Sequence, residues 1–129
     1  MATLTPTLTL VSTDALTDSL NLTATDSLSI LGQSKRFTHV CSDTKANLLL
    51  AADYTKSYVY LKNNDAAIVI HIGMDTEADD SIDNDATDLF IELAAGEFAF
   101  FPWSSTYNLH VDAASGTPTL EVMIFQAVA

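Results

Sequence analysis

From Phe37 onward, the chain is a series of short runs rich in apolar, β-branched and aromatic residues. The clearest runs are "FTHVCS", "LFIEL", "EFAFFPW" and "TLEVMIFQAV", and residues that favour turns separate them. Such runs bounded by turn residues are typical of strands, and no stretch after Gly32 keeps a helical period over three turns. Several short strands at even spacing in 129 residues predict an all-β fold, an antiparallel β-sandwich or jelly roll.

The stretch "SYVYLKNNDAAIVIHIG" has the pattern of a β-hairpin. Residues 58–62 and 67–72 would be its strands. Asn63, Asn64 and Asp65 would form the turn, because Asn and Asp tolerate a positive φ. Further turns are expected at Ala95-Gly96 and Ser115-Gly116.

The segment "AAGEFAFFPW" carries aromatic residues on both faces of one expected strand. Phe98 and Phe100 would point to one face, and Phe101 and Trp103 to the other. Pro102 is expected to end the strand because it cannot donate a hydrogen bond. Both faces are apolar, so one would face the core and the other a subunit or partner. We assign Phe101 and Trp103 to the partner interface.

Residues 1–31 differ in composition from the rest and are rich in Thr, Ser and Leu. Leu4, Leu8 and Leu10 alternate with threonines, which predicts an extended arm. We expect this arm to add backbone to a neighbouring subunit or capsid, with these three leucines at the contact. The sandwich domain would then comprise residues 32–129.

The charge balance excludes several partners. Seventeen acidic residues face five basic ones, for a formal net charge of -12. Such a chain repels phosphate backbones and anionic membranes, so we expect it to bind neither nucleic acid nor membrane. A single cysteine, Cys41, and the absence of a signal-like start are expected for synthesis in a reducing cytoplasm.

An acidic loop follows the expected hairpin, with the sequence "MDTEADDSIDNDATD". Asp83, Asp85 and Thr87 copy the first three ligand positions of an EF-hand calcium loop. Asp88 then stands where the turn glycine belongs, and the twelfth position lacks a glutamate. Asp83, Asp85 and Asp88 are calcium candidates, and a solvated surface loop is the alternative. We predict no cofactor.

The three histidines raise the possibility of a metal site. His39 and Cys41 would share one strand face, which permits joint coordination of a soft metal. His71 lies within "IVIHIG". His110 alternates with Leu109 and Val111 and is expected to be exposed. No two histidines have a recognised ligand spacing, so structural histidines are the expectation.

No catalytic motif is present in the sequence, and we expect a protein that is not an enzyme. Gly96 and Pro102 reproduce the start of the second cupin signature, but Ser104 and Tyr107 replace its glycine and its histidine. A small cupin-like enzyme or isomerase is therefore an alternative. Another is a carbohydrate-binding sandwich on a tail or fibre. Its stacking aromatics would be Trp103, Tyr107 and Tyr54.

Three segments together resemble small virion proteins of tailed bacteriophages: "SYVYLKNNDAAIVIHIG", "LFIELAAGEFAFFPW" and "TLEVMIFQ". The resemblance covers about residues 57–126. It implies a β-sandwich with a structural role, such as capsid decoration or cementing, and no catalytic residues. The implied partners are the major capsid protein and further copies of this chain, as a homotrimer on the capsid surface of the virion. It would be made in the host cytoplasm.

Overall fold

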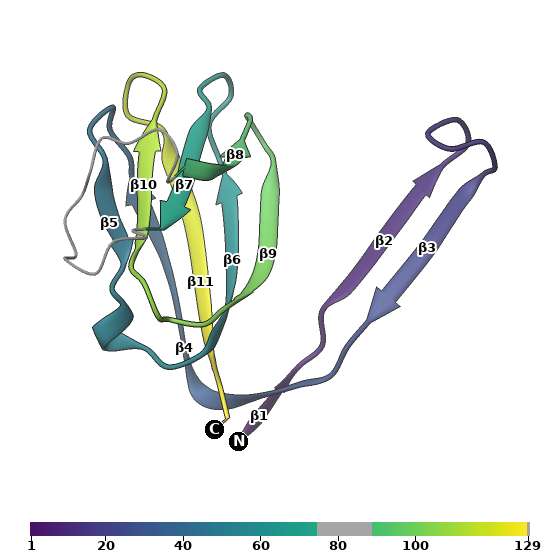
Figure 1. Ribbon diagram of the computed structural model, residues 1–129, viewed down its shortest axis with the longest axis horizontal. Helices are drawn as coiled ribbons and strands as arrows, with labels where there is room; N and C mark the ends of the chain where they lie inside the picture. Colours follow the sequence, from purple (N-terminus) through teal and green to yellow (C-terminus); the bar gives the residue numbers. More distant parts are fainter. Residues whose placement is uncertain (75–88, 129) are drawn as a thin grey trace. The chain divides into compact units, whose positions relative to one another are not determined.

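The computed structural model describes residues 1–74 and 89–128 (Figure 1). The chain divides into two compact units. The smaller contains Met1–Gly32 and Val128, and the larger contains Gln33–Ala127. In the described residues, no helix is long and apolar enough to cross a membrane.

Two facing sheets form the larger unit (Figure 1). Their elements are β4 (Leu28–Val40, which begins in the smaller unit), β5 (Ala46–Leu49), the 3₁₀ turn η1 (Ala51–Asp53), β6 (Ser57–Asn63), β7 (Ile70–Met74), β8 (Leu89–Leu93), β9 (Phe98–Trp103), β10 (Leu109–Ala113) and β11 (Thr119–Ala127). One sheet has the order β4-β11-β6-β9, and the other has the order β5-β10-β7-β8. Because the chain repeatedly crosses between antiparallel sheets, the predicted sandwich or jelly roll is confirmed.

The alternating runs place every second side chain in the core between the sheets. Strand β6 shows this most clearly, since each odd-numbered residue from Ser57 to Asn63 is buried and each even-numbered one is partly exposed. The same alternation in β11 buries Leu120, Val122 and Ile124. The second sheet contributes Ile70, Ile72, Leu109 and Val111. Burial of each such side chain stabilises the fold by roughly 1.5–3 kcal/mol.

Leu61→Ala tests this core. Leu61 is fully buried, so its truncation leaves a cavity and should lower the free energy of unfolding by about 2–5 kcal/mol. Val40→Ala, at an exposed strand position, is the matched control and should change it by no more than about 0.5 kcal/mol. Urea denaturation followed by circular dichroism measures both. Equal losses in the two variants would contradict the placement of β6.

The predicted hairpin at residues 58–72 is wrong. Strand β6 pairs with β11 and β9, while β7 pairs with β10 and β8 in the other sheet. The connection is therefore a corner between sheets. None of Asn63, Asn64 and Asp65 has a positive φ. Sequence alternation reports which faces are buried and carries no information about which strands pair.

Side chains, in place of a tight turn, hold this corner. The amide nitrogen of Asn63 donates to the carbonyls of Ile68 and Leu93 at 2.8 and 2.9 Å. Its side-chain oxygen accepts from the backbone N–H of Asp65 at 2.9 Å. The Asp65 carboxylate in turn accepts from the N–H groups of Ala67 and Ile68, both at 2.8 Å. These last two bonds favour the charged form and lower the pKa of Asp65 below its ordinary value of 3.8.

Asp65→Asn tests the corner through its pH dependence. Because the pKa of Asp65 is lowered by folding, its charge stabilises the native state above pH 3.8 and stops doing so as the pH falls through the folded pKa. The wild type should be more stable than Asp65→Asn at neutral pH, and the difference should shrink below pH 3.8. Denaturant titrations between neutral and acidic pH measure it. A difference independent of pH would show that the carboxylate charge has no role.

Strand β9 runs through Pro102 to Trp103, so the expectation that Pro102 ends the strand is wrong. Pro102 lies opposite Tyr58 of β6. Strand β9 stands at the edge of its sheet in the described chain. A proline is tolerated there because it need not donate to a further strand.

The smaller unit contains the Thr-rich arm. Strand β1 (Ala2–Leu4) pairs with the start of β4, with Leu4 opposite Leu28. Strands β2 (Thr7–Ser12) and β3 (Leu20–Thr25) pair with each other as a two-stranded hairpin (Figure 1). The arm is extended, as predicted, and it also turns back on itself.

Candidate functional site

The two faces of β9 are the reverse of our assignment. Trp103 is 3% exposed and belongs to the core, and Phe101 packs against that core half-buried. Phe98 is 61% exposed on the opposite face, with Phe100 beside it. The prediction of Phe101 and Trp103 as partner contacts is therefore wrong. Both faces of this strand are aromatic, so the sequence cannot indicate which one turns inward.

An aromatic surface covers the outer side of β11, β6 and β9. Its cross-strand rows place Phe125 beside Tyr58, and Tyr60 between Met123 and Phe100. We call the following set the aromatic face: Tyr58, Tyr60, Phe98, Phe100, Met123 and Phe125. The Tyr58 and Phe100 rings stack with centroids 6.4 Å apart, and those of Tyr60 and Phe98 lie 6.3 Å apart. Phe98 and Phe100 are exposed and the other four are half-buried. An apolar surface of this kind is a candidate interaction surface.

Basic residues border the aromatic face. The Lys56 ammonium lies 5.9 Å from the Tyr58 ring centroid, within the range of a cation–π contact. Lys62 occupies the row between Glu121 and Phe98. Arg36 forms an ion pair with Glu121 at 2.8 Å. Three of the five basic residues of the chain thus lie around one surface of a strongly acidic protein.

The β2–β3 hairpin carries a second apolar surface. Register places Leu8 opposite Ala24, Leu10 opposite Leu22, and Ser12 opposite Leu20. We call the following set the hairpin apolar face: Leu8, Leu10, Leu20, Leu22 and Ala24. Leu10 and Leu22 are 42% and 46% exposed. The predicted contact residues Leu8 and Leu10 therefore lie on one face, while Leu4 belongs to β1.

The opposite side of the hairpin carries hydroxyl groups. Thr7, Thr9, Thr23 and Thr25 lie on this side, and the hydroxyls of Thr7 and Thr25 are 3.2 Å apart. The side is not wholly polar, because Val11 is also on it and is 69% exposed. The hairpin is therefore amphipathic. A two-stranded hairpin alone is at best marginally stable in water, so its apolar face favours contact with a partner.

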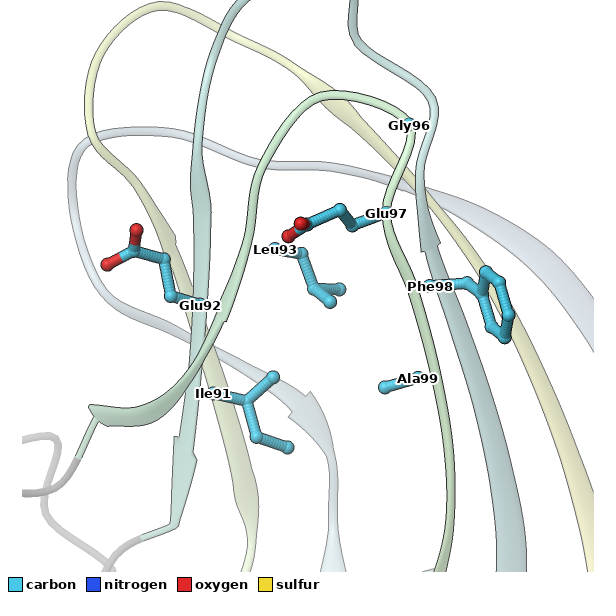
Figure 2. Close-up of a pocket in the computed structure, with 7 residues that line it drawn as sticks. All are labelled: Ile91, Glu92, Leu93, Gly96, Glu97, Phe98 and Ala99. Atoms are coloured by element: carbon cyan, nitrogen blue, oxygen red, sulfur yellow. The ribbon is translucent and has the colours of Figure 1, made fainter. Parts of the chain in front are cut away.

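A shallow hollow of about 570 Å³ opens between β8 and β9, at the edges of the two sheets (Figure 2). Figure 2 shows Ile91 and Ala99 facing each other across it, with Phe98 on the far side of β9. The Glu97 carboxylate accepts a hydrogen bond from the Ala94 N–H at 2.8 Å, which caps the turn at Gly96. The lining combines apolar walls with the carboxylates of Glu92 and Glu97. This hollow therefore has the character of an open sandwich edge.

The histidines are distributed over separate places. His110 is 1% exposed on β10, so the expectation that it is exposed is wrong. The register of β10 shifts between Leu109 and His110, and both side chains are buried there. This irregularity breaks the alternation from which exposure was inferred.

His71 lies in a row with two carboxylates across three strands. Its Nδ1 is 3.1 Å from Asp112 on β10, and its Nε2 is 3.7 Å from Glu92 on β8. These partners suit a structural histidine. Over residues 1–74 and 89–128, no group of three His, Cys, Asp or Glu side chains is placed so that it could hold a metal ion.

His39 and Cys41 do not favour the joint metal site. Strand β4 ends at Val40, and Cys41 follows it into the core. Burial, and secondarily the charge of Asp112, raise the pKa of Cys41 to about 11. The thiol is then protonated at neutral pH, whereas metals bind the thiolate. Burial also lowers the pKa of His39.

Two other predicted sites are the sugar-stacking aromatic residues and the calcium loop. Trp103 is buried, and its indole N–H donates to the carbonyl of Tyr107 at 3.1 Å. Tyr54 packs on the Trp103 ring at 6.0 Å. The prediction of Trp103 as a sugar-stacking residue is therefore wrong.

The calcium candidates Asp83, Asp85 and Asp88 lie outside the described residues.

Sequence reasoning missed the aromatic face as a unit. The signal was present as alternation in "SYVYLK" and "EVMIF". Reading it required knowing that β6 lies between β11 and β9, because only that order brings Tyr58, Tyr60, Met123 and Phe125 to one surface.

Comparison with known proteins identifies a fold. No protein-family model and no curated protein matches the chain. One similar solved structure comes from work entitled "Bacillus endospore appendages form a novel family of disulfide-linked pili". The match has a TM-score of 0.54 at 14% sequence identity and covers 79% of this chain and 91% of the other. It supports the β-sandwich fold.

Metal analysis tests the cupin-like alternative. The described histidines and Cys41 are dispersed, so we expect the purified protein to contain no stoichiometric iron, zinc or manganese. Treatment with a chelator should leave its melting temperature unchanged. Mass spectrometry of the metal content, with buffer as the control, gives the answer. One equivalent of any of these metals would favour the enzyme.

Proposed function

We propose that the protein is a structural subunit of a larger assembly, joined to its neighbours through the β2–β3 hairpin. The observation that carries this proposal is the exposed hairpin apolar face, including Leu8, Leu10 and Leu22. A two-stranded hairpin is at best marginally stable in water from its own pairing. A neighbouring molecule that covers the leucines would supply the missing apolar burial.

Our more specific proposal is a decoration or cement protein on the head of a tailed bacteriophage. The sequence resemblance over residues 57–126 supports it. The excess of acidic residues would also keep a surface-displayed protein soluble. In this proposal the partners are the major capsid protein and two further copies of the chain. A trimer would match the local three-fold axes of a shell.

The similar pilus protein supports the broader proposal of an assembled structural role. Disulfide linkage, as named for that protein, would require accessible cysteines. Cys41 is the single cysteine of this chain; it is buried, and its pKa is raised to about 11. Thiolate attack is therefore disfavoured. We infer that copies of this protein would associate without covalent links.

Deletion of the arm tests the proposal. A truncation that starts at Gly32 removes β1 and the hairpin and retains the larger unit, which has its own core. We expect it to keep its β-sheet circular dichroism spectrum and to lose self-association and particle binding. This also tests the predicted division into residues 1–31 and 32–129, which stays a prediction.

Electron microscopy of the proposed phage particles measures binding of the truncated protein, and the full-length protein is the control. Extra density on the head for the full-length protein, lost with the truncation, is the expected result. Full-length protein that neither self-associates nor appears on a particle would overturn the proposed function. A truncation that unfolds, while the full-length protein is a stable monomer, would place the arm in the fold itself.

A further inference from the structure

We propose that the hairpin apolar face of one copy packs on the aromatic face of a second copy. This inference rests on the proposed function, because it names the partner surface for the hairpin. The chain exposes an aliphatic surface on one unit and an aromatic surface on the other. A second copy carries both, so the protein can serve as its own partner.

The two surfaces agree in dimensions and pattern. Strands β2, β3 and β9 have six residues each, and β6 has seven. At about 3.3 Å per residue, each strand is on the order of 20 Å long. The hairpin presents its leucines in successive cross-strand rows, and the aromatic face presents its rings in rows across three strands. Two such faces can pack as stacked sheets, with aliphatic side chains between rings.

Charge favours the same pairing. Residues 1–34 contain the acids Asp14, Asp18 and Asp26 and no base. The aromatic face is bordered by Lys56 and Lys62, while Arg36 already pairs with Glu121. The chain as a whole has a net charge of -12 and repels an acidic hairpin. The aromatic face is thus the place where apolar surface and positive charge coincide.

The contact is heterologous, because donor and acceptor surfaces differ and lie on the same chain. Successive copies would join head to tail. Such contacts close into a ring where the rotation permits, and otherwise extend as a filament. A closed ring of three would agree with the proposed trimer.

Two single variants separate donor from acceptor. Leu10→Glu places a charge on the hairpin apolar face and leaves the aromatic face intact. Phe100→Lys does the reverse. Both side chains are exposed in the described chain, so the fold should persist, as circular dichroism and melting temperature verify. Phe98→Lys is a second acceptor variant in case Phe100→Lys unfolds.

We expect each variant alone to be monomeric at concentrations where the wild type assembles. An equimolar mixture should form a heterodimer that grows no further. In it, the intact hairpin of Phe100→Lys occupies the intact aromatic face of Leu10→Glu. Light scattering after size-exclusion chromatography measures the masses. The matched controls are Thr9→Glu on the hydroxyl side of β2 and Phe90→Lys on β8, an exposed phenylalanine of the other sheet. Both controls should assemble like the wild type.

Other outcomes overturn the inference. Wild-type mass retained by folded Leu10→Glu or Phe100→Lys would show that these surfaces do not form the contact, and the proposed assembly role would survive. Two monomeric variants that stay monomeric when mixed would show that the surfaces do not bind each other. A monomeric wild type would refute this self-contact. The structural role would then rest on binding to the particle alone.

Discussion

Strand β6 is the element on which most of the structure depends. It pairs with β11 on one side and β9 on the other, and its odd-numbered residues are buried in the core. The strand thus joins its sheet and anchors the contact with the second sheet. Its last residue, Asn63, binds the carbonyls of Ile68 and Leu93 and fixes the exit of the chain. The even-numbered side of the same strand supplies the centre of the aromatic face. Core and aromatic face are therefore two consequences of one alternation.

This arrangement explains how a small sandwich can be stable and still expose large rings. The core between the sheets already provides apolar burial, so the aromatic face is available for other contacts. The stacked tyrosine and phenylalanine rings also shield one another in part. The hairpin differs, because in the described chain its sheet has two strands and carries an apolar face. These two surfaces and the resemblance to virion proteins are the basis of the proposal that the chain is a subunit of a larger assembly.

Much of the fold could be predicted from the sequence, because strand formation depends on local patterns. The runs predicted as strands at Leu89 to Leu93 and at the end of the chain coincide with β8 and β11. Pairing could not be predicted, because it depends on residues distant in sequence. The corner at Asn63 looked like a hairpin turn since Asn and Asp favour both. The prediction that His110 is exposed was wrong for a local reason. The register of β10 shifts at this residue, and sequence alternation does not reveal such a shift. The prediction of which face of β9 turns inward was wrong because aromatic residues occupy both of its faces.

Electron cryomicroscopy of the assembled full-length protein tests the central claim most directly. The account predicts that the β2–β3 hairpin of each subunit lies against the outer side of β6 and β9 of a neighbour, with Leu10 in contact with the rings of the aromatic face. An assembly in which these rings face solvent, or in which the hairpin contacts another surface, would contradict it.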